Sequence, residues 1–412
     1  MSERPSYGKL FRDRSFGSLW LAQLISQSGD AVFDVALLWL VLVTTGSVAL
    51  VGVTQAAVLL PSVLAGPIAG VYADRLNRRN LMIASNLVQG VVTAVLSVLY
   101  LAGALNFPFL ILLVLLLYTA AQFFRAANGA IIPRIVAREN LGAANGLFTL
   151  TTSANQLASY TVGGVILAAV GAVASITYDS LTFFLAAALL SFIARSYGQS
   201  RAEGAPAPLN PGFRKEFREG LAYVKQSRLF LELIVFGILV NFLGGGIAAL
   251  TAPYVRNGLH GDALAYGILL SSFALGAIVG SVLLGKVNFR VYVGKLLFVG
   301  VIAAGLLIAL AGLATSVPEG LVIFFAIGAV EASLNLPIQV LVQTQVPGEL
   351  LGRAFAVLGS SLAASQPIAA IVFGALAEAS GVGYLFTATG VGLVIVTAAL
   401  YVPFGSLRSA RY

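Results

Sequence analysis

Four polar side chains near the N-terminus recur at spacings that place them on one side of a helix. They are Gln23, Gln27, Asp30 and Asp34, at increments of four, three and four residues. The segment that carries them, residues 16–43, is long and apolar enough to cross a bilayer. Hydrocarbon disfavours such a stripe, so we expect it to face water or another helix. Asp30 and Asp34 are therefore candidates to carry protons and attract cations; the alternative is a hydrogen bond that packs two helices.

Two further polar stripes predict partners for these carboxylates. Tyr118, Gln122 and Arg125 share a face of the segment that begins near Phe107, and Glu331 heads a run with a polar residue at every fourth position. We expect proton coupling from Asp30, Asp34, Arg125 and Glu331, although Arg125 could instead be an anchor at the membrane interface. The expected substrate-binding residues are Gln23, Gln27, Asp30, Asp34, Gln156, Asn241, Glu331, Asn335 and Gln339.

Three other acidic residues are expected to be structural or solvated. Asp179 lies inside an apolar segment and is expected to be structural, whereas Glu232 and Glu378 lie near segment ends and are expected to be solvated. After Asn241, the three glycines of residues 244–246 predict a break in the helix at membrane depth.

The composition excludes a soluble globular protein. Of 412 residues, 59% are hydrophobic and 10% are charged, and the mean hydropathy is +0.95; soluble domains are about 25% charged. We predict an all-α membrane protein with twelve transmembrane helices, because the apolar runs lack the two-residue alternation of a membrane barrel. The runs begin near Phe16, Leu50, Leu81, Phe107, Leu141, Val173, Phe230, Ala263, Val291, Pro318, Leu350 and Gly383.

The charge distribution predicts the orientation. All of the 24 basic residues except Arg125 and Arg256 lie at the chain ends or in alternate connections. This is the positive-inside pattern, with both termini cytoplasmic. Anionic lipid at the cytoplasmic face, rather than nucleic acid, is the partner expected for this charge. The chain has no cysteine, so neither a disulfide nor a thiolate metal site is expected.

The connection between the second and third apolar runs is short and strongly charged. It holds Asp74, Arg75, Arg78 and Arg79 within six residues. The preceding Gly66-Pro67 and Gly70 predict a bend, and they leave room for a neighbouring helix to approach closely. We interpret this loop as a moving contact.

The hydropathy pattern divides the chain into two halves. We predict an N-terminal six-helix bundle at 1–195, a cytoplasmic linker with a basic amphipathic helix at 196–228, and a C-terminal six-helix bundle at 229–412. The segment Arg138–Asn145 is echoed by Gly348–Phe355, each at the start of the fifth run of its half. Such a relation between halves is found in transporters built from parallel repeats.

The motif Gly70-x-x-x-Asp74-Arg75-x-x-Arg78-Arg79, together with the two six-span halves, resembles the major facilitator superfamily. Residues 27–30, 45–47, 217–223 and 343–353 are similar to the third drug:proton antiporter family, which includes macrolide-efflux and enterobactin-exporter relatives. The resemblance implies the major facilitator fold and a conformational latch between the halves. The residues that it implies for the latch are Gly70, Asp74, Arg75, Arg78, Arg79, Glu139, Gly352 and Arg353.

These observations predict a proton-coupled exporter of hydrophobic cationic or neutral amphiphiles, working by alternating access. The alternatives are export of a siderophore, lipid or divalent metal ion, and a membrane receptor or scaffold without transport. No hydrolase or zinc-protease motif occurs, so no enzyme, cofactor or resident metal is expected. We expect a monomer in the plasma membrane of a bacterium or archaeon.

Overall fold

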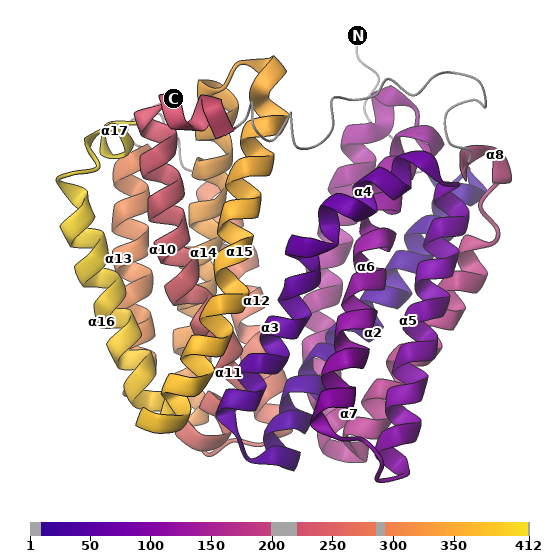
Figure 1. Ribbon diagram of the computed structural model, residues 1–412, viewed down its shortest axis with the longest axis horizontal. Coiled ribbons are helices and arrows are strands. Elements are labelled where there is room, and N and C mark those ends of the chain that lie inside the picture. Colours follow the sequence, from indigo (N-terminus) through magenta and orange to yellow (C-terminus); the bar gives the residue numbers. More distant parts are fainter. Residues whose placement is uncertain (1–9, 199–220, 286–292, 411–412) are drawn as a thin grey trace. The chain divides into compact units, whose positions relative to one another are not determined.

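The structure is a computed structural model that describes residues 10–198, 221–285 and 293–410. A few helix side chains, including those of Asn335 and Glu349, lie outside the described part, as does most of the predicted amphipathic helix. Every element in the described part is a helix (Figure 1), as expected for an all-α protein.

The longer helices are α2 (Arg14–Thr45), α3 (Val48–Leu64), α4 (Gly66–Arg75), α5 (Arg78–Leu101), α6 (Phe107–Ile135), α7 (Leu141–Leu190), α10 (Arg228–Ala249), α12 (Ala263–Gly285), α13 (Val293–Ala311), α14 (Val317–Gln345), α15 (Gly348–Ser380) and α16 (Val382–Tyr401). Short elements are η1 (Arg138–Asn140), α8 (Arg195–Gly198), α11 (Thr251–Pro253), η2 (Tyr254–Gly258) and α17 (Gly405–Arg408).

The helices fit a protein that crosses a membrane many times. In the described part, nine helices are long and apolar enough to span a bilayer, or ten if the bent pair α3 and α4 forms one span. That pair bends by 45°, as expected from Pro61 and the Gly66-Pro67 step. The helices begin close to the predicted positions, and the count of twelve spans stays a prediction.

Helix α7 consists of two arms that meet at Gly171. This residue has φ 82° and ψ 176°, which no helix contains. Contacts with α2 show that the arms run in opposite directions. In the first arm, Asn155 donates to Leu24 O at 3.1 Å and Gly163 packs against Val32; in the second, Asp179 lies against Gly29. Along the first arm, a higher residue number lies beside a higher residue number of α2. Along the second arm the order is reversed, because Asp179 lies beside Gly29 and Ala194, in the turn after this arm, donates its N–H to Ser15 Oγ at 3.2 Å. The arms therefore form a helical hairpin.

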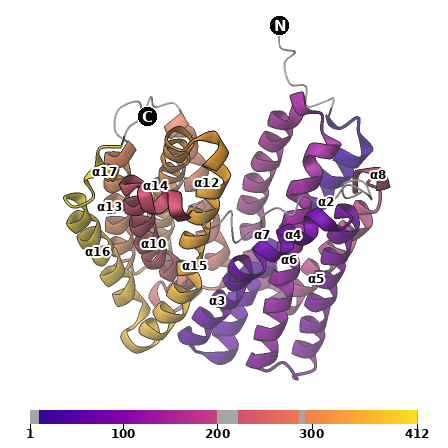
Figure 2. The same ribbon diagram turned by 45° about the horizontal axis from the view of Figure 1, so that its top comes forward.

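The chain divides into two compact units. The N-terminal unit comprises Met1–Leu40 and Ala57–Pro206, and the C-terminal unit comprises Val41–Ala56 and Ala207–Tyr412. The tip of the hairpin between α2 and α3 therefore belongs with the C-terminal residues. In the N-terminal unit, α5 packs along both α6 and α7, and α4 packs on α6 (Figure 1). In the C-terminal unit, α12 packs on α14, α13 on α16, and α10 on α15 (Figure 2).

The predicted helix break at residues 244–246 is wrong. Helix α10 continues through all three glycines to Ala249, and the irregular turn α11–η2 follows only after it. Two of the glycines instead admit α15: a Cβ on Gly245 would lie 3.2 Å from Gln366 Cγ, and one on Gly246 would overlap the ring of Phe373. These glycines serve close helix packing.

The close approach of a neighbouring helix beside Gly66 and Gly70 stays a prediction. No described atom lies within 4 Å of a Cβ built on either residue.

Candidate functional site

A cavity of about 320 Å³ lies inside the N-terminal unit. It is bordered by α2, α6 and the first arm of α7, with one residue from α5. Its lining residues are Gln23, Ser26, Gln27, Asp30, Ala31, Phe33, Asp34, Gln89, Leu117, Tyr118, Ala121, Phe124, Arg125, Asn128, Thr152, Gln156 and Tyr160. All the N-terminal residues predicted to bind substrate or protons are among them.

Two carboxylates and one guanidinium meet in this cavity. Asp30 is exposed to it, whereas Asp34 is half-buried and accepts a hydrogen bond from the Tyr118 hydroxyl. Arg125 lines the same cavity and attracts both carboxylates electrostatically. The structure thus places Arg125 at the cavity, where its charge partly offsets the two acids.

Amide side chains form a second polar layer. Gln23 Nε2 donates to Asn128 Oδ1 at 2.5 Å, and Gln27 Nε2 lies 3.5 Å from Gln23 Oε1. On α7, Gln156 Nε2 donates to the Tyr160 hydroxyl at 2.7 Å. Amides offer both donors and acceptors, so this layer can hydrogen-bond a neutral polar group as well as a cation.

A polar face of α5 was missed by the sequence analysis. Ser85, Gln89, Thr93 and Ser97 recur at every fourth residue and are all buried. Gln89 reaches the cavity, and Ser97 Oγ lies 3.3 Å from Thr177 Oγ1 on the second arm of α7. The four-residue spacing was the signal that could have revealed this face.

The C-terminal candidates lie in a separate unit. Asn241 bridges two helices, because its Nδ2 donates to Gly237 O at 3.0 Å and its Oδ1 accepts from Gln366 Nε2 at 3.1 Å. Glu331 and Gln339 are exposed on α14, while the side chain of Asn335 lies outside the described part. Their sharing one chamber with Asp30 stays a prediction.

The charged loop between α4 and α5 is held by local contacts. Asp74 is 78% exposed and pairs with Arg78 at 3.7 Å. Asn77 caps α5 by accepting from Asn80 N at 3.1 Å, and Arg79 donates to Ser191 O on the turn after α7. Arg75 lies in the last turn of α4.

The remaining latch residues belong to both units. Glu139 is exposed in η1, within the N-terminal unit, whereas Gly352 and Arg353 lie in the first turns of α15, within the C-terminal unit. The latch between the units stays a prediction.

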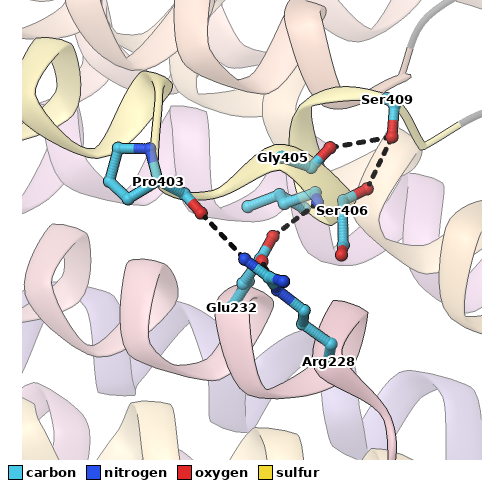
Figure 3. Close-up of polar contacts among 7 residues, drawn as sticks. Arg228, Glu232, Pro403, Gly405, Ser406 and Ser409 are labelled. Atoms are coloured by element: carbon cyan, nitrogen blue, oxygen red, sulfur yellow. Dashed lines mark hydrogen bonds and ion pairs between the residues drawn. The ribbon is translucent and has the colours of Figure 1, made fainter.

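Glu232 is not solvated as predicted. It is 6% exposed, and it accepts from Arg228 Nε at 2.9 Å and from Leu407 N at 2.7 Å (Figure 3). Its hydrogen bond to Leu407 N therefore connects α17 to the start of α10.

Glu378 is exposed, as expected, but it is also bonded. Its Oε2 accepts from Ser47 Oγ at 2.8 Å and from Ala49 N at 2.7 Å, at the first turn of α3. An anion in this position complements the positive end of the helix dipole.

Comparisons with known proteins agree with this architecture. A solved structure of a bacterial homologue of the human lysosomal transporter Spinster, inward-facing and unoccupied, matches with a TM-score of 0.74 at 18% identity, over 98% of this chain and 99% of that chain. The fold is that of major facilitator transporters. A family model of this superfamily, described as transmembrane secretion effector, matches residues 8–408.

The chain belongs to the transmembrane secretion effector family of the major facilitator superfamily. Macrolide efflux protein A of Streptococcus pyogenes is 25% identical over 388 residues, covering 92% of this chain and 94% of that protein. The multidrug efflux pump Tap of Mycolicibacterium fortuitum is 24% identical over 392 residues, covering 93% and 94%. The resemblance drawn from the charged loop and the two halves is confirmed.

Proposed function

We propose that the chain is a proton-coupled exporter of hydrophobic amphiphiles, cationic or neutral, that works by alternating access. The observation that supports this most is the cavity of the N-terminal unit, where Asp30 and Asp34 lie beside Arg125 and several aromatic rings. The names of the relatives, macrolide efflux and multidrug efflux, favour outward transport of such compounds.

The lining of the cavity suits a lipophilic cation. The rings of Phe124, Tyr118 and Tyr160 offer apolar surface and cation–π contacts. Asp30 supplies a negative charge that is exposed within the cavity. A neutral amphiphile would use the same rings and the amide groups of Gln27 and Gln156 in place of the carboxylate.

The same carboxylate couples export to proton flow. Asp30 holds either a proton or the substrate cation, so that binding of one expels the other. Arg125 lines the same cavity and attracts the Asp30 carboxylate, so it partly compensates this charge when neither the proton nor the substrate is bound. Glu331 of α14 is proposed as the corresponding group of the C-terminal unit.

The membrane orientation is proposed from the charges. Both termini would be cytoplasmic, with anionic lipid at that face, in the plasma membrane of a bacterium or archaeon and as a monomer. The Asp74 loop would act as a latch against the start of α15 near Gly352 and Arg353, with Glu139 beside its arginines.

Uptake into inverted membrane vesicles tests this function. With an acid interior, the protein should accumulate tetraphenylphosphonium, and Asp30→Asn and Glu331→Gln should each reduce gradient-driven uptake to the level of empty vesicles. Asp262→Asn is the matched control, because this exposed carboxylate caps α12 by accepting from Ala265 N at 2.9 Å, outside the cavity. Undiminished uptake in both test variants would show that neither carboxylate couples transport to proton flow. No gradient-driven flux in the unmodified protein would favour the receptor or scaffold.

A further inference from the structure

The cavity of the N-terminal unit is small and polar for a site that takes hydrophobic compounds. Sites for drug-sized molecules have volumes of about 300–1,000 Å³ and are lined mainly by hydrophobic and aromatic side chains. This cavity, at about 320 Å³, lies at the lower end of that range. Its apolar lining residues are Ala31, Phe33, Leu117, Ala121 and Phe124, and the others are polar. Volume and lining together suit the polar head of an amphiphile rather than the whole molecule.

The first arm of α7 brings an amide close to the polar stripe of α2. Asn155 Nδ2 donates to Leu24 O at 3.1 Å, which fixes the level at which the two helices meet. Gln156, the residue after Asn155, lines the cavity together with Gln27. The contact therefore places Gln156 at the level of the turn of α2 that precedes Asp30.

The amides lie beside the carboxylates of the cavity. On α2, Gln27 precedes Asp30 by three residues, so the two side chains are neighbours on the helix surface, with Cβ atoms about 5–6 Å apart. On α7, Gln156 Nε2 donates to the Tyr160 hydroxyl at 2.7 Å, and this hydroxyl interacts electrostatically with Asp34. Amide groups from two helices therefore flank the two carboxylates.

These amides keep hydrogen-bonding capacity that the fold does not use. Gln156 is exposed and Gln27 is half-buried, and in the described part of the chain the Oε1 atom of neither side chain accepts a hydrogen bond. An amide offers both donors and acceptors, and a hydroxyl group likewise donates and accepts. Hydroxyl groups of a ligand therefore match the amides, whereas tetraphenylphosphonium has no group that could bond to them.

We propose that this cavity recognises an amphiphile whose head is a protonated amine flanked by hydroxyl groups. The amine binds at Asp30, and the hydroxyl groups bond to the amides of Gln27 and Gln156. This inference rests on the proposed function and names the chemistry of its substrate. Asp30 still exchanges one proton for one ammonium group, and the amides select which amines bind.

Three compounds with the same eight-carbon chain test the head group. N-octyldiethanolamine carries an amine and two hydroxyl groups, N,N-diethyloctylamine carries the amine alone, and the diethanolamide of octanoic acid carries the hydroxyl groups without charge. Their binding to the full chain in lipid nanodiscs is measured by calorimetry at neutral pH, with empty nanodiscs to correct for partition into lipid. N-octyldiethanolamine should bind about tenfold more tightly than N,N-diethyloctylamine, because it adds two hydrogen bonds. The diethanolamide should bind more weakly than N-octyldiethanolamine, because it has no charge for Asp30.

Variants of the amides show where the preference arises. Gln27→Leu and Gln156→Leu should each reduce the difference between the two amines to about threefold, since each removes one of the two bonds. The double variant should bind both amines equally. Gln122→Leu is the matched control: Gln122 is buried on α6, donates to Tyr118 O at 3.3 Å and does not line the cavity, so the tenfold preference should remain.

The comparison of the two amines needs only the unmodified protein, so the inference can fail even where a variant does not fold. Equal affinity for the two amines, or no binding of either, would overturn recognition of the hydroxyl groups. A preference that survives in the double variant would overturn the role of the two glutamines. Binding of the diethanolamide as tightly as the amine would overturn the placement of the amine at Asp30. The proposed function fails separately, if the unmodified protein shows no gradient-driven uptake of tetraphenylphosphonium.

Discussion

At the scale of single residues, neighbours decide whether a carboxylate holds the fold or meets a ligand. Asp34 accepts from Tyr118 and Glu232 accepts from Leu407 N, so both are engaged with the protein. Asp30 is exposed to a cavity that also contains Arg125. Its spacing from Gln27 and Asp34 could be read from the sequence, but the burial of Asp179 and Glu232 could not. Their surroundings come from residues far along the chain, namely Gly29 for Asp179 and Leu407 for Glu232.

Glu232 provides a prediction about stability. Glu232→Ala should lower the free energy of unfolding by about 1–3 kcal/mol, because Leu407 N loses its acceptor in a buried position. Arg228→Ala is the comparison variant: it removes the ion pair, whose Arg228 side chain is 76% exposed, but leaves the bond from Leu407 N to Glu232, so it should cost less than Glu232→Ala. Denaturant titration of both variants in detergent measures the difference. Equal losses would show that the ion pair, rather than the bond to α17, carries the stabilisation.

At the scale of elements, glycines act in two ways that look alike in a sequence. Gly171 separates the arms of α7 because its backbone angles lie in a region that is essentially closed to other residues. Gly245 and Gly246 do not interrupt α10; they admit Gln366 and Phe373 of α15. A glycine that ends a helix, such as Gly171, can be expected where an apolar run ends. The second depends on a helix more than a hundred residues away, which explains why the predicted break was wrong.

The turn of α7 can be tested by adding one methyl group. Gly171→Ala should destabilise the protein by about 1–3 kcal/mol through backbone strain. Gly146→Ala, within the first arm, is the control: no described atom lies within 4 Å of the added Cβ, and alanine favours a helix over glycine by about 0.5–1 kcal/mol. Thermal unfolding should therefore shift in opposite directions for the two variants. A neutral Gly171→Ala would mean that the turn adopts another conformation.

At the scale of the whole molecule, the sequence predicted the fold class, the superfamily and nearly all helix starts. These depend on hydropathy and charge, which are local properties. The N-terminal polar stripe was also predicted, because its spacing lies within one helix, and the structure shows Gln23, Gln27, Asp30 and Asp34 lining one cavity. The sequence did not predict that Val41–Ala56 groups with the C-terminal residues. There, Ala49 N donates to Glu378 and Gly52 lies against Ala370 and Gly374 of α15. Such a grouping depends on contacts between distant segments.

We propose that the polar stripe of α2 lines a water-filled cavity that opens in turn to each side of the membrane. The chain has no cysteine, so a single introduced thiol reports its own position. Gln27→Cys should react with a membrane-impermeant thiol reagent both in intact cells and in inverted vesicles, and tetraphenylphosphonium should slow both reactions. Ser175→Cys, at a fully buried position, should remain unlabelled. If Gln27→Cys fails to react from one side or from both, the cavity does not open to both sides of the membrane.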